Sequence, residues 1–318
     1  MTDVAITPDW LRGALVSTFG SRVEEGAPLA RHTTFGIGGP ADWLVEVRSA
    51  DEMLALVVIA RDAHVPLTII GSGSNLLVAD RGVRGIVARV HGGDVRREGE
   101  SLVRADAGVT VNGLVRWTIG LGLAGLEAWA GTPGTVGGAL HGNAHFQGRL
   151  IGDTVGEVRV VSRDGVVSDL PASEMRFGYD TSRLQTTGEV VLSATFAVSQ
   201  GDPQLLREIA RASLAFRKRT QPLHLPSAGC IFQNPDPRRD VVPTGVPRSA
   251  GALIDLAGLK GASAGGARVS PSHANFIVNE GGATAADVRT LVERCRSAVA
   301  ERFGIVLRDE IVYAGEFQ

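Results

Sequence analysis

The stretch from Gly131 to Asn143 constrains the fold of this chain more than any other. It reads Gly-Thr-Pro-Gly-Thr-Val-Gly-Gly-Ala-Leu-His-Gly-Asn, with four glycines and a proline in its first eight residues. Such a run cannot form the interior of an ordinary helix or strand, and it lets backbone N–H groups approach a ligand closely. A second small-residue run, Gly71–Leu77, follows the apolar segment Leu67–Ile70. Two separated loops of this kind predict a long phosphate-bearing ligand held at more than one place, and therefore a nucleotide cofactor.

Composition and charge exclude several classes of protein. The 318 residues are enough for two or three domains, and 32 Lys and Arg against 34 Asp and Glu leave no electrostatic footprint for nucleic acid. No apolar run approaches the ~20 residues of a membrane span, and the N-terminus lacks the pattern of a signal peptide. Cys230 and Cys295 have neither metal-ligand spacing nor a disulfide framework, which is typical of a reducing compartment. We expect a cytoplasmic protein with no nucleic-acid or membrane partner.

Periodicity and capping residues predict a chain of mixed helices and strands. A capping box at Ser49–Glu52 opens one helix, and Asp202-Pro203 opens another that ends in the basic run Arg217–Arg219, which we expect on a solvated face. Cys295 falls on the apolar stripe of the last helix and is expected in a core. The predicted helices cover residues 8–19, 50–63, 111–121, 203–219, 251–256 and 284–303. The predicted strands cover 43–47, 67–70, 190–198, 274–278 and 305–307, with a hairpin over 158–169 that turns at Asp164-Gly165.

The two glycine loops fit none of the common nucleotide motifs. The first loop has Leu76 where a Rossmann fingerprint needs its third glycine, and no Gly-Lys-Ser/Thr occurs in the chain. His141 and His145 are four residues apart, but the glycine and asparagine between them weaken the helix that a zinc pair requires, so no metal site is expected. The loops could also be only tight turns between strands. Their density of Gly, Ser, Thr and Asn beside apolar segments favours ligand contact.

Further motifs follow one another along nearly the whole chain. They are His32–Asp42, Gly71–Leu77, Gly125–Gly138, Gln221–Leu223, Pro226–Pro235, Gly258–Gly261, His273–Asn279 and Phe303–Glu310. Together they resemble the UDP-N-acetylenolpyruvoylglucosamine reductase family, and the short Tyr179–Gly188 connection resembles its compact, type II form. The resemblance implies an α+β fold with a PCMH-type FAD-binding region at about 31–198. That region comprises two α+β subdomains, 1–82 and 83–200, and an α+β substrate-binding domain follows at 201–318.

The resemblance also implies an activity. NADPH reduces FAD, the flavin N5 delivers hydride to C3 of an enolpyruvyl ether, and C2 takes a proton to give UDP-N-acetylmuramate for peptidoglycan synthesis. We expect a monomer that uses FAD, NADPH and a UDP-sugar. The residues expected to bind FAD are Gly71, Ser72, Gly73, Ser74, Asn75, Leu76, Gly131, Thr132, Pro133, Gly134, Thr135, Gly138, Asn143 and Ile151.

Two residues are expected to carry the proton chemistry. Cys230, in Ser227-Ala-Gly-Cys230, occupies a position where the family usually has serine. A thiol, with an unperturbed pKa of about 8.5, is a stronger acid than an alcohol and serves as the predicted proton donor. Glu310 follows the apolar segment at 305–307, and the resemblance places it as the acid that hydrogen-bonds the enolate region or relays the proton.

The substrate side departs from the family pattern. The family has an essential arginine in a Tyr-Arg-x-Ser pattern, whereas this chain reads Tyr179-Asp180-Thr-Ser. Since an aspartate cannot stabilise an enolate, Arg183 is the favoured substitute and Arg176 the second candidate. Gln233 stands where the family often has a basic residue. The residues expected to bind substrate are Tyr179, Asn234, Lys260 and His273.

Two other functions remain open at the level of sequence. A related PCMH-type flavin oxidase would attach FAD covalently, with His141 or His145 as the candidate residue. A flavin- or UDP-sugar-binding protein without catalysis would account for Asp180.

Overall fold

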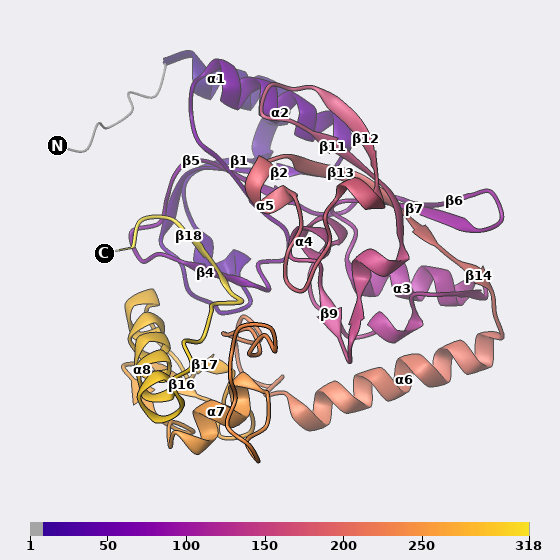
Figure 1. Ribbon diagram of the computed structural model, residues 1–318. Coiled ribbons are helices and arrows are strands. Elements are labelled where there is room, and N and C mark those ends of the chain that lie inside the picture. The colour runs from indigo at the N-terminus through magenta and orange to yellow at the C-terminus, as the bar shows by residue number, and fades with distance from the viewer. Residues whose placement is uncertain (1–8, 318) are drawn as a thin grey trace. The chain divides into compact units, whose positions relative to one another are not determined.

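The computed structural model describes residues 9–317, and the chain divides into two compact units (Figure 1). Unit 1 comprises the chain up to Ala27, Ala41–Ser72 and Arg84–Ala215. Unit 2 comprises Pro28–Pro40, Gly73–Val83 and the chain from Phe216 onward. Both helices and sheets are present, and the predicted α+β class is confirmed. Among the described residues, no helix has both the length and the apolar composition to cross a membrane.

Unit 1 contains two main sheets. Its helices are α1 (Asp9–Phe19), α2 (Ala50–Asp62), α3 (Val111–Gly120), α4 (Val136–His141), α5 (Leu184–Thr187) and most of α6 (Pro203–Thr220). Its strands are β1 (Val23–Pro28), β2 (Pro40–Val47), β3 (Leu67–Ile70), β5 (Val83–Val90), β6 (Val95–Glu98), β7 (Leu102–Asp106), β8 (Leu123–Ala124), β9 (His145–Phe146), β10 (Arg149–Leu150), β11 (Val155–Val161), β12 (Val167–Pro171), β13 (Val190–Ala197) and β14 (Ser199–Gln200). The predicted helix over 8–19 is α1, and Pro8 lies outside the described residues.

The first sheet has the strand order β1-β2-β5-β3, with β3 and β5 parallel. Helices α1 and α2 lie together beside it in Figure 1, and their apolar stripes pack against β2 and β5 in one core. Leu11, Leu15 and Leu56 in these stripes are fully buried. Each such side chain contributes about 1.5–3 kcal/mol relative to an exposed one. The periodicity that predicted these helices is therefore the pattern that builds this core.

The capping box predicted at Ser49–Glu52 forms only in part. The Ser49 hydroxyl accepts the Glu52 N–H at 3.2 Å, as predicted, but the Glu52 carboxylate accepts the N–H of Arg48 at 2.8 Å. Both Glu52 carboxylate oxygens also accept hydrogen bonds from the Arg22 guanidinium, each at 2.7 Å. This two-point ion pair with a residue distant in sequence holds the carboxylate away from the position that the local motif predicts.

The second sheet is antiparallel, with the order β12-β11-β13-β7-β6. Strands β11 and β12 form the predicted hairpin, and Gly165 in its turn has φ +82°, a left-handed conformation that favours glycine. Two small antiparallel pairs, β9 with β10 and β8 with β14, complete the strands of unit 1. The pair of β9 and β10 follows α4, and His145 is the first residue of β9.

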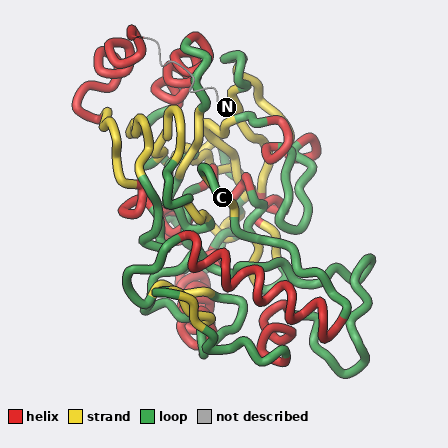
Figure 2. The backbone as a smooth tube through the Cα atoms, turned by 90° about the vertical axis from the view of Figure 1, so that its left-hand side faces the viewer, coloured by secondary structure: helices red, strands yellow, loops and turns green. Residues whose placement is uncertain are grey.

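Unit 2 has smaller sheets and more loop. Its helices are α7 (Ala250–Leu256), α8 (Ala285–Phe303) and the end of α6, and its strands are β4 (Leu76–Val78), β15 (Ser263–Ala264), β16 (Ala267–Val269), β17 (Ile277–Asn279) and β18 (Val312–Ala314). Strands β15, β16 and β17 form an antiparallel sheet, and β18 runs parallel to β4. Residues 221–249 form neither helix nor strand and belong to the loops drawn green in Figure 2.

The core of unit 2 joins segments that are far apart in sequence. Phe35 and Leu77 pack in one cluster with α7, α8 and the sheet of β15–β17. Cys295 is 1% exposed in this cluster, which confirms its prediction as a core residue. The amide of Asn279 donates to the carbonyl oxygen of Phe35 at 3.0 Å across this long sequence separation. The two early segments are therefore integral to the C-terminal core.

Three local predictions are wrong in unit 2. The strand expected at 274–278 is the shorter β17, because the backbone at Phe276 bonds to the turn at His273 and to Ser270. Residues 305–307 are buried in part but form no strand, and the ladder with β4 begins only at Val312. Arg217 is 6% exposed rather than solvated. It lies on the same side of α6 as the buried Leu206 and Ser213, eleven and four residues before it, and helix periodicity therefore places it on the buried face.

Asp80 closes the N-terminus of α8, and its replacement by alanine is expected to destabilise unit 2. Its carboxylate accepts the N–H groups of Ala285 and Ala286 at 2.8 and 3.1 Å. Loss of both bonds at this exposed helix end should cost about 1–2 kcal/mol. Urea denaturation at neutral pH measures the change in unfolding free energy. Asp80→Asn, which keeps one acceptor oxygen, should lose less, and equal stability of all three proteins would contradict the capping role.

Candidate functional site

The first glycine loop begins in unit 1 at the end of β3. A Cβ atom on Gly71 would lie 2.4 Å from the hydroxyl oxygen of Thr135, so the strand end packs directly on the residue that caps α4. Because no side chain fits between them, position 71 requires glycine. The two small-residue loops found in the sequence therefore meet within unit 1.

The second loop is held in place by a side chain of unit 1. The amide of Asn112 accepts the Gly131 N–H at 2.6 Å and donates to the Thr132 carbonyl oxygen at 3.2 Å. Gly131 and Gly134 have φ values of +82° and +107°, in the region that favours glycine. The loop backbone is therefore fixed, and Pro133 and Gly138 lie exposed at its surface.

Asn143 organises the segment that follows α4. It is fully buried, and its side chain donates to the Gly178 carbonyl oxygen at 2.7 Å and accepts the Gly152 N–H at 2.8 Å. Ile151, the residue before Gly152, is 1% exposed. Asn143 thus joins the second glycine loop region to the turn that carries Asp180.

In unit 2, the continuation of the first loop is tied to the segment that carries Cys230. A Cβ on Gly73 would lie 2.2 Å from the carbonyl oxygen of His32, so the loop packs tightly on the residues before Thr34. The Thr34 hydroxyl lies 3.2 Å from the carbonyl oxygen of Gly73 and 2.7 Å from that of Ser227. Ser227 opens the small-residue turn that ends at Cys230.

Cys230 and Glu310 lie on adjacent backbone segments of unit 2. The Glu310 N–H donates to the carbonyl oxygen of Ile231 at 2.8 Å, and Phe232 forms a bridge with Asp309. The side chain of Asn75 donates to the carbonyl oxygen of Glu310 at 3.0 Å. The structure therefore brings together a predicted cofactor residue and both predicted proton-transfer residues.

The buried side chain of Asn275 fixes the other edge of the Cys230 segment. Its amide donates to the Phe232 carbonyl oxygen at 2.8 Å and accepts the Phe232 N–H at 3.0 Å, while Cys230 forms a bridge with Phe276. Because both edges of this extended segment are bonded, the half-buried Cys230 side chain starts from a fixed backbone.

The remaining predicted substrate residues of unit 2 have different surroundings. The side-chain oxygen of Asn234 accepts the Ala250 N–H at 3.0 Å, at the start of α7. The ammonium of Lys260 pairs with Asp255 at 2.9 Å. Burial lowers the pKa of His273, and the neighbouring Lys260 acts in the same direction. Lys260 and His273 therefore interact electrostatically, whereas the side chain of Asn234 is bonded to the backbone of α7.

Comparisons with known proteins identify the family. A model described as FAD binding domain matches residues 41–170, and one described as UDP-N-acetylenolpyruvoylglucosamine reductase, C-terminal domain, matches 221–314. UDP-N-acetylenolpyruvoylglucosamine reductase 2 of Symbiobacterium thermophilum is 42% identical over 291 residues, which are 91% of this chain and 91% of that protein. The chain belongs to the UDP-N-acetylenolpyruvoylglucosamine reductase family. The Moorella thermoacetica reductase of the same name is also 42% identical, over 96% of this chain and 98% of its own.

A solved structure agrees with this assignment. The UDP-N-acetylenolpyruvylglucosamine reductase of Thermus caldophilus has a TM-score of 0.77 and 35% identity, covering 92% of this chain and 99% of that one. The resemblance to the reductase family and the PCMH-type α+β fold are confirmed. As a member of the reductase family, the protein is an FAD-dependent oxidoreductase.

The residues of the glycine loops fit an FAD. The FAD-binding model covers both loops in unit 1, where Gly71 leaves no room for a side chain against Thr135. Gly131 and Gly134 supply left-handed backbone, and Ser72 in the first loop is exposed. Small residues and exposed backbone are the chemistry that holds a pyrophosphate. The fit rests on this backbone cradle rather than on charged side chains.

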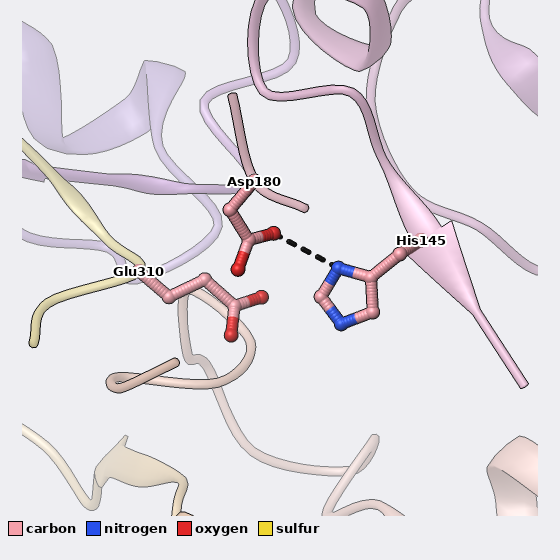
Figure 3. A group of neighbouring side chains, drawn as sticks. All are labelled: His145, Asp180 and Glu310. Atoms are coloured by element: carbon pink, nitrogen blue, oxygen red, sulfur yellow. Dashed lines mark hydrogen bonds and ion pairs between the residues drawn. The ribbon is translucent and has the colours of Figure 1, made fainter. Parts of the chain in front are cut away.

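Asp180, at the position where the sequence resemblance implies an arginine, is paired with His145 in the structure (Figure 3). The Asp180 Oδ1 and His145 Nδ1 atoms are 2.9 Å apart. The candidate substitute Arg183 is bound to the Glu189 carboxylate through two nitrogens, each at 3.0 Å. Arg176 is exposed, as is Tyr179 at 41%. Glu310, also labelled in Figure 3, belongs to unit 2 and is described with that unit.

Arg217 is a buried charged residue that interacts with Cys230 and that the sequence did not lead us to expect at this site. Burial lowers the pKa of this guanidinium to about 10, while its interaction with Cys230 raises it. A buried cation that interacts with a thiol favours its thiolate form. The signal in the sequence is its spacing from Leu206 and Ser213 on the buried face of α6.

The two cysteines are expected to differ in reactivity. Burial raises the pKa of the Cys295 thiol to about 12, whereas Cys230 is only half-buried. Because the thiolate is the nucleophile, iodoacetamide at neutral pH should modify Cys230 in the folded protein and leave Cys295 unmodified. Mass spectrometry of peptides identifies the modified residue, with the Cys230→Ser protein as the control. Equal modification of both cysteines in folded protein would contradict this expectation.

Proposed function

We propose that the protein catalyses NADPH-dependent reduction of UDP-N-acetylglucosamine enolpyruvate to UDP-N-acetylmuramate, a step of peptidoglycan precursor synthesis. The relatives that align over more than nine-tenths of this chain carry the name of this reductase. One structural observation carries the proposal. The loop of Gly73 to Asn75 is linked through Thr34 to the Cys230 turn and through Asn75 to Glu310. A predicted cofactor loop and the predicted proton donors thus share one hydrogen-bonded framework.

The cofactor supplies one part of the chemistry. A bound FAD would supply the hydride chemistry that connects NADPH with C3 of the enolpyruvyl ether. The sequence predicts that Asn143 and Ile151 bind FAD, but both are fully buried and do not reach a ligand. The glycine loops at 71–76 and 131–138 would hold the flavin. Their role is to fix its position, because the backbone of these loops is constrained by glycine conformations and by Asn112.

The protein supplies the proton and stabilises charge. Arrival of hydride at C3 leaves negative charge on C2 and the adjoining carboxylate. The thiol of Cys230 donates its proton to C2 and becomes a thiolate, which Arg217 stabilises. Glu310 hydrogen-bonds the enolate region or relays the replacement proton to Cys230. Tyr179, Asn234, Lys260 and His273 bind the UDP-sugar, and Arg183 is the arginine that the sequence offers for the substrate carboxylate.

Anaerobic spectroscopy of the FAD-loaded enzyme tests this function. NADPH should bleach the flavin, and the enolpyruvyl UDP-sugar should restore its absorbance while mass spectrometry shows a product with two added hydrogens. Acid precipitation should release the flavin into solution. A flavin that stays with the precipitate and is reoxidised only by oxygen would support an oxidase instead, and a flavin that the substrate never reoxidises would reject the proposed reaction.

A further inference from the structure

The turn that carries Asp180 is fastened to the segment after α4. Gly178 and Thr181 exchange two backbone hydrogen bonds at 3.0 and 3.3 Å, which close the turn around Asp180. Asn143 donates to the carbonyl oxygen of Gly178 at 2.7 Å, and the Ser182 hydroxyl donates to that of His141 at 2.7 Å. Both ends of the turn are thereby attached to the segment from His141 to Asn143, which leads into β9.

This attachment brings the Asp180 carboxylate to the imidazole of His145, the first residue of β9. The Asp180 side chain is 10% exposed and that of His145 is 24% exposed, and Figure 3 shows the two directed toward one another. One carboxylate oxygen accepts from Nδ1 at 2.9 Å. The other, Oδ2, is inaccessible to solvent and has no hydrogen-bond partner among residues 9–317. A carboxylate buried to this degree requires a compensating cation or donor.

The pair orients the imidazole for contact with a ligand. With Nδ1–H directed to Asp180, the ring has its second nitrogen, Nε2, on the opposite edge. When the ring is doubly protonated, Nε2 is a cationic hydrogen-bond donor, the kind of group that binds a carboxylate. The ring also lies against Tyr179, with centroids 4.6 Å apart, so its plane is fixed on one face. The imidazole is therefore held at two points.

The arginine nearest in sequence is already engaged. Arg183 places two nitrogens on Glu189 and a third within 3.8 Å of Glu174. Binding a substrate carboxylate through this guanidinium would require it to leave the bidentate pair with Glu189. His145 needs no such rearrangement because its contact with Asp180 uses only Nδ1.

We propose that His145, oriented by Asp180, binds the carboxylate of the enolpyruvyl substrate and stabilises the charge that hydride transfer places there. This inference rests on the proposed function. It assigns the positive charge to residue 145 and a positioning role to Asp180, where the family pattern has an arginine at position 180.

Equilibrium binding to the FAD-loaded protein tests the proposal apart from turnover. UDP-N-acetylmuramate and UDP-N-acetylglucosamine differ by the lactyl group that bears the carboxylate, so the ratio of their Kd values reports recognition of that group. Calorimetry should show that the wild-type protein prefers UDP-N-acetylmuramate. His145→Ala should reduce this preference about tenfold or more and leave the Kd for UDP-N-acetylglucosamine within about twofold.

Two further variants test orientation and charge. Asp180→Asn should also reduce the preference, because an amide does not fix a cationic imidazole as a carboxylate does. The double variant His145→Gly with Asp180→Arg returns the cation to position 180 and should recover the preference lost in His145→Ala. Arg149→Ala, which removes an exposed cation from the partner strand β10, is the matched control and should leave the ratio unchanged.

The outcomes separate this inference from the function beneath it. A wild-type protein that binds neither nucleotide would reject the proposed function. A wild-type preference that persists in His145→Ala but disappears in Arg183→Ala would overturn the role of His145 and support Arg183. A lower melting temperature of His145→Ala with an unchanged ratio would show that the pair is only structural and would also overturn the proposal.

Discussion

Replacement of Cys230 by alanine is expected to slow reduction of the enolpyruvyl group by about 10²–10⁴-fold, the usual contribution of a positioned acid. The Cys230 segment is fixed at both edges, by Asn275 and by the backbone next to Glu310, so the alanine variant should keep its conformation. The binding of NADPH and the transfer of hydride to the flavin do not require this thiol. Stopped-flow absorbance should therefore show normal bleaching by NADPH and a nearly absent reoxidation by substrate.

Cys230→Ser and Cys295→Ala serve as controls for this prediction. Serine keeps an O–H donor at the same position and should retain activity, since the family usually has serine there. Cys295 is 1% exposed in the core of unit 2, and its replacement should affect stability rather than the reoxidation rate. If the Cys230→Ala protein reoxidises at the wild-type rate, the proton donor is another group.

Features of the fold that depend on local sequence could be predicted. Helices α1, α2 and α8 follow from apolar periodicity, and the β11–β12 hairpin follows from the Asp164-Gly165 turn. In both cases the physical cause lies within a few residues of its effect. The expectation that the Gly131–Asn143 run forms no helix interior is wrong in part, because α4 includes Gly137 and Gly138. The ligand contacts expected at the two glycine loops stay a prediction.

The features that could not be predicted depend on contacts between distant segments. The apolar run at 305–307 resembles a strand, yet the backbone at Gln233 bonds to Arg308, and no strand ladder forms until β18. Arg217 belongs to a basic run, which indicates a solvated face, yet it lies on the buried face of α6. His145 and Asp180 are 35 residues apart, and nothing in their local sequence predicts that a turn attached by Asn143 brings them together.

Replacement of Asn143 by alanine should have the largest effect on stability, about 3–7 kcal/mol. The side chain is fully buried and makes two hydrogen bonds, to the Gly178 carbonyl oxygen and from the Gly152 N–H. Loss of each leaves a buried backbone group unsatisfied at about 1–3 kcal/mol. The backbone φ of +46° adds about 1 kcal/mol, since asparagine tolerates this left-handed conformation better than alanine does. Urea denaturation of the FAD-loaded protein measures the sum.

Two variants divide this cost between the backbone and the hydrogen bonds. Asn143→Gly loses the same bonds but adopts the left-handed conformation freely, so it should be about 1 kcal/mol more stable than Asn143→Ala. Asn143→Asp keeps the acceptor for Gly152 but replaces the donor to Gly178 with a carboxylate oxygen. It should therefore release the Gly178–Ser182 turn selectively and weaken the pairing of Asp180 with His145. An alanine variant within about 1 kcal/mol of wild type would mean that Asn143 does not hold the turn, and the orientation of His145 would then need another source.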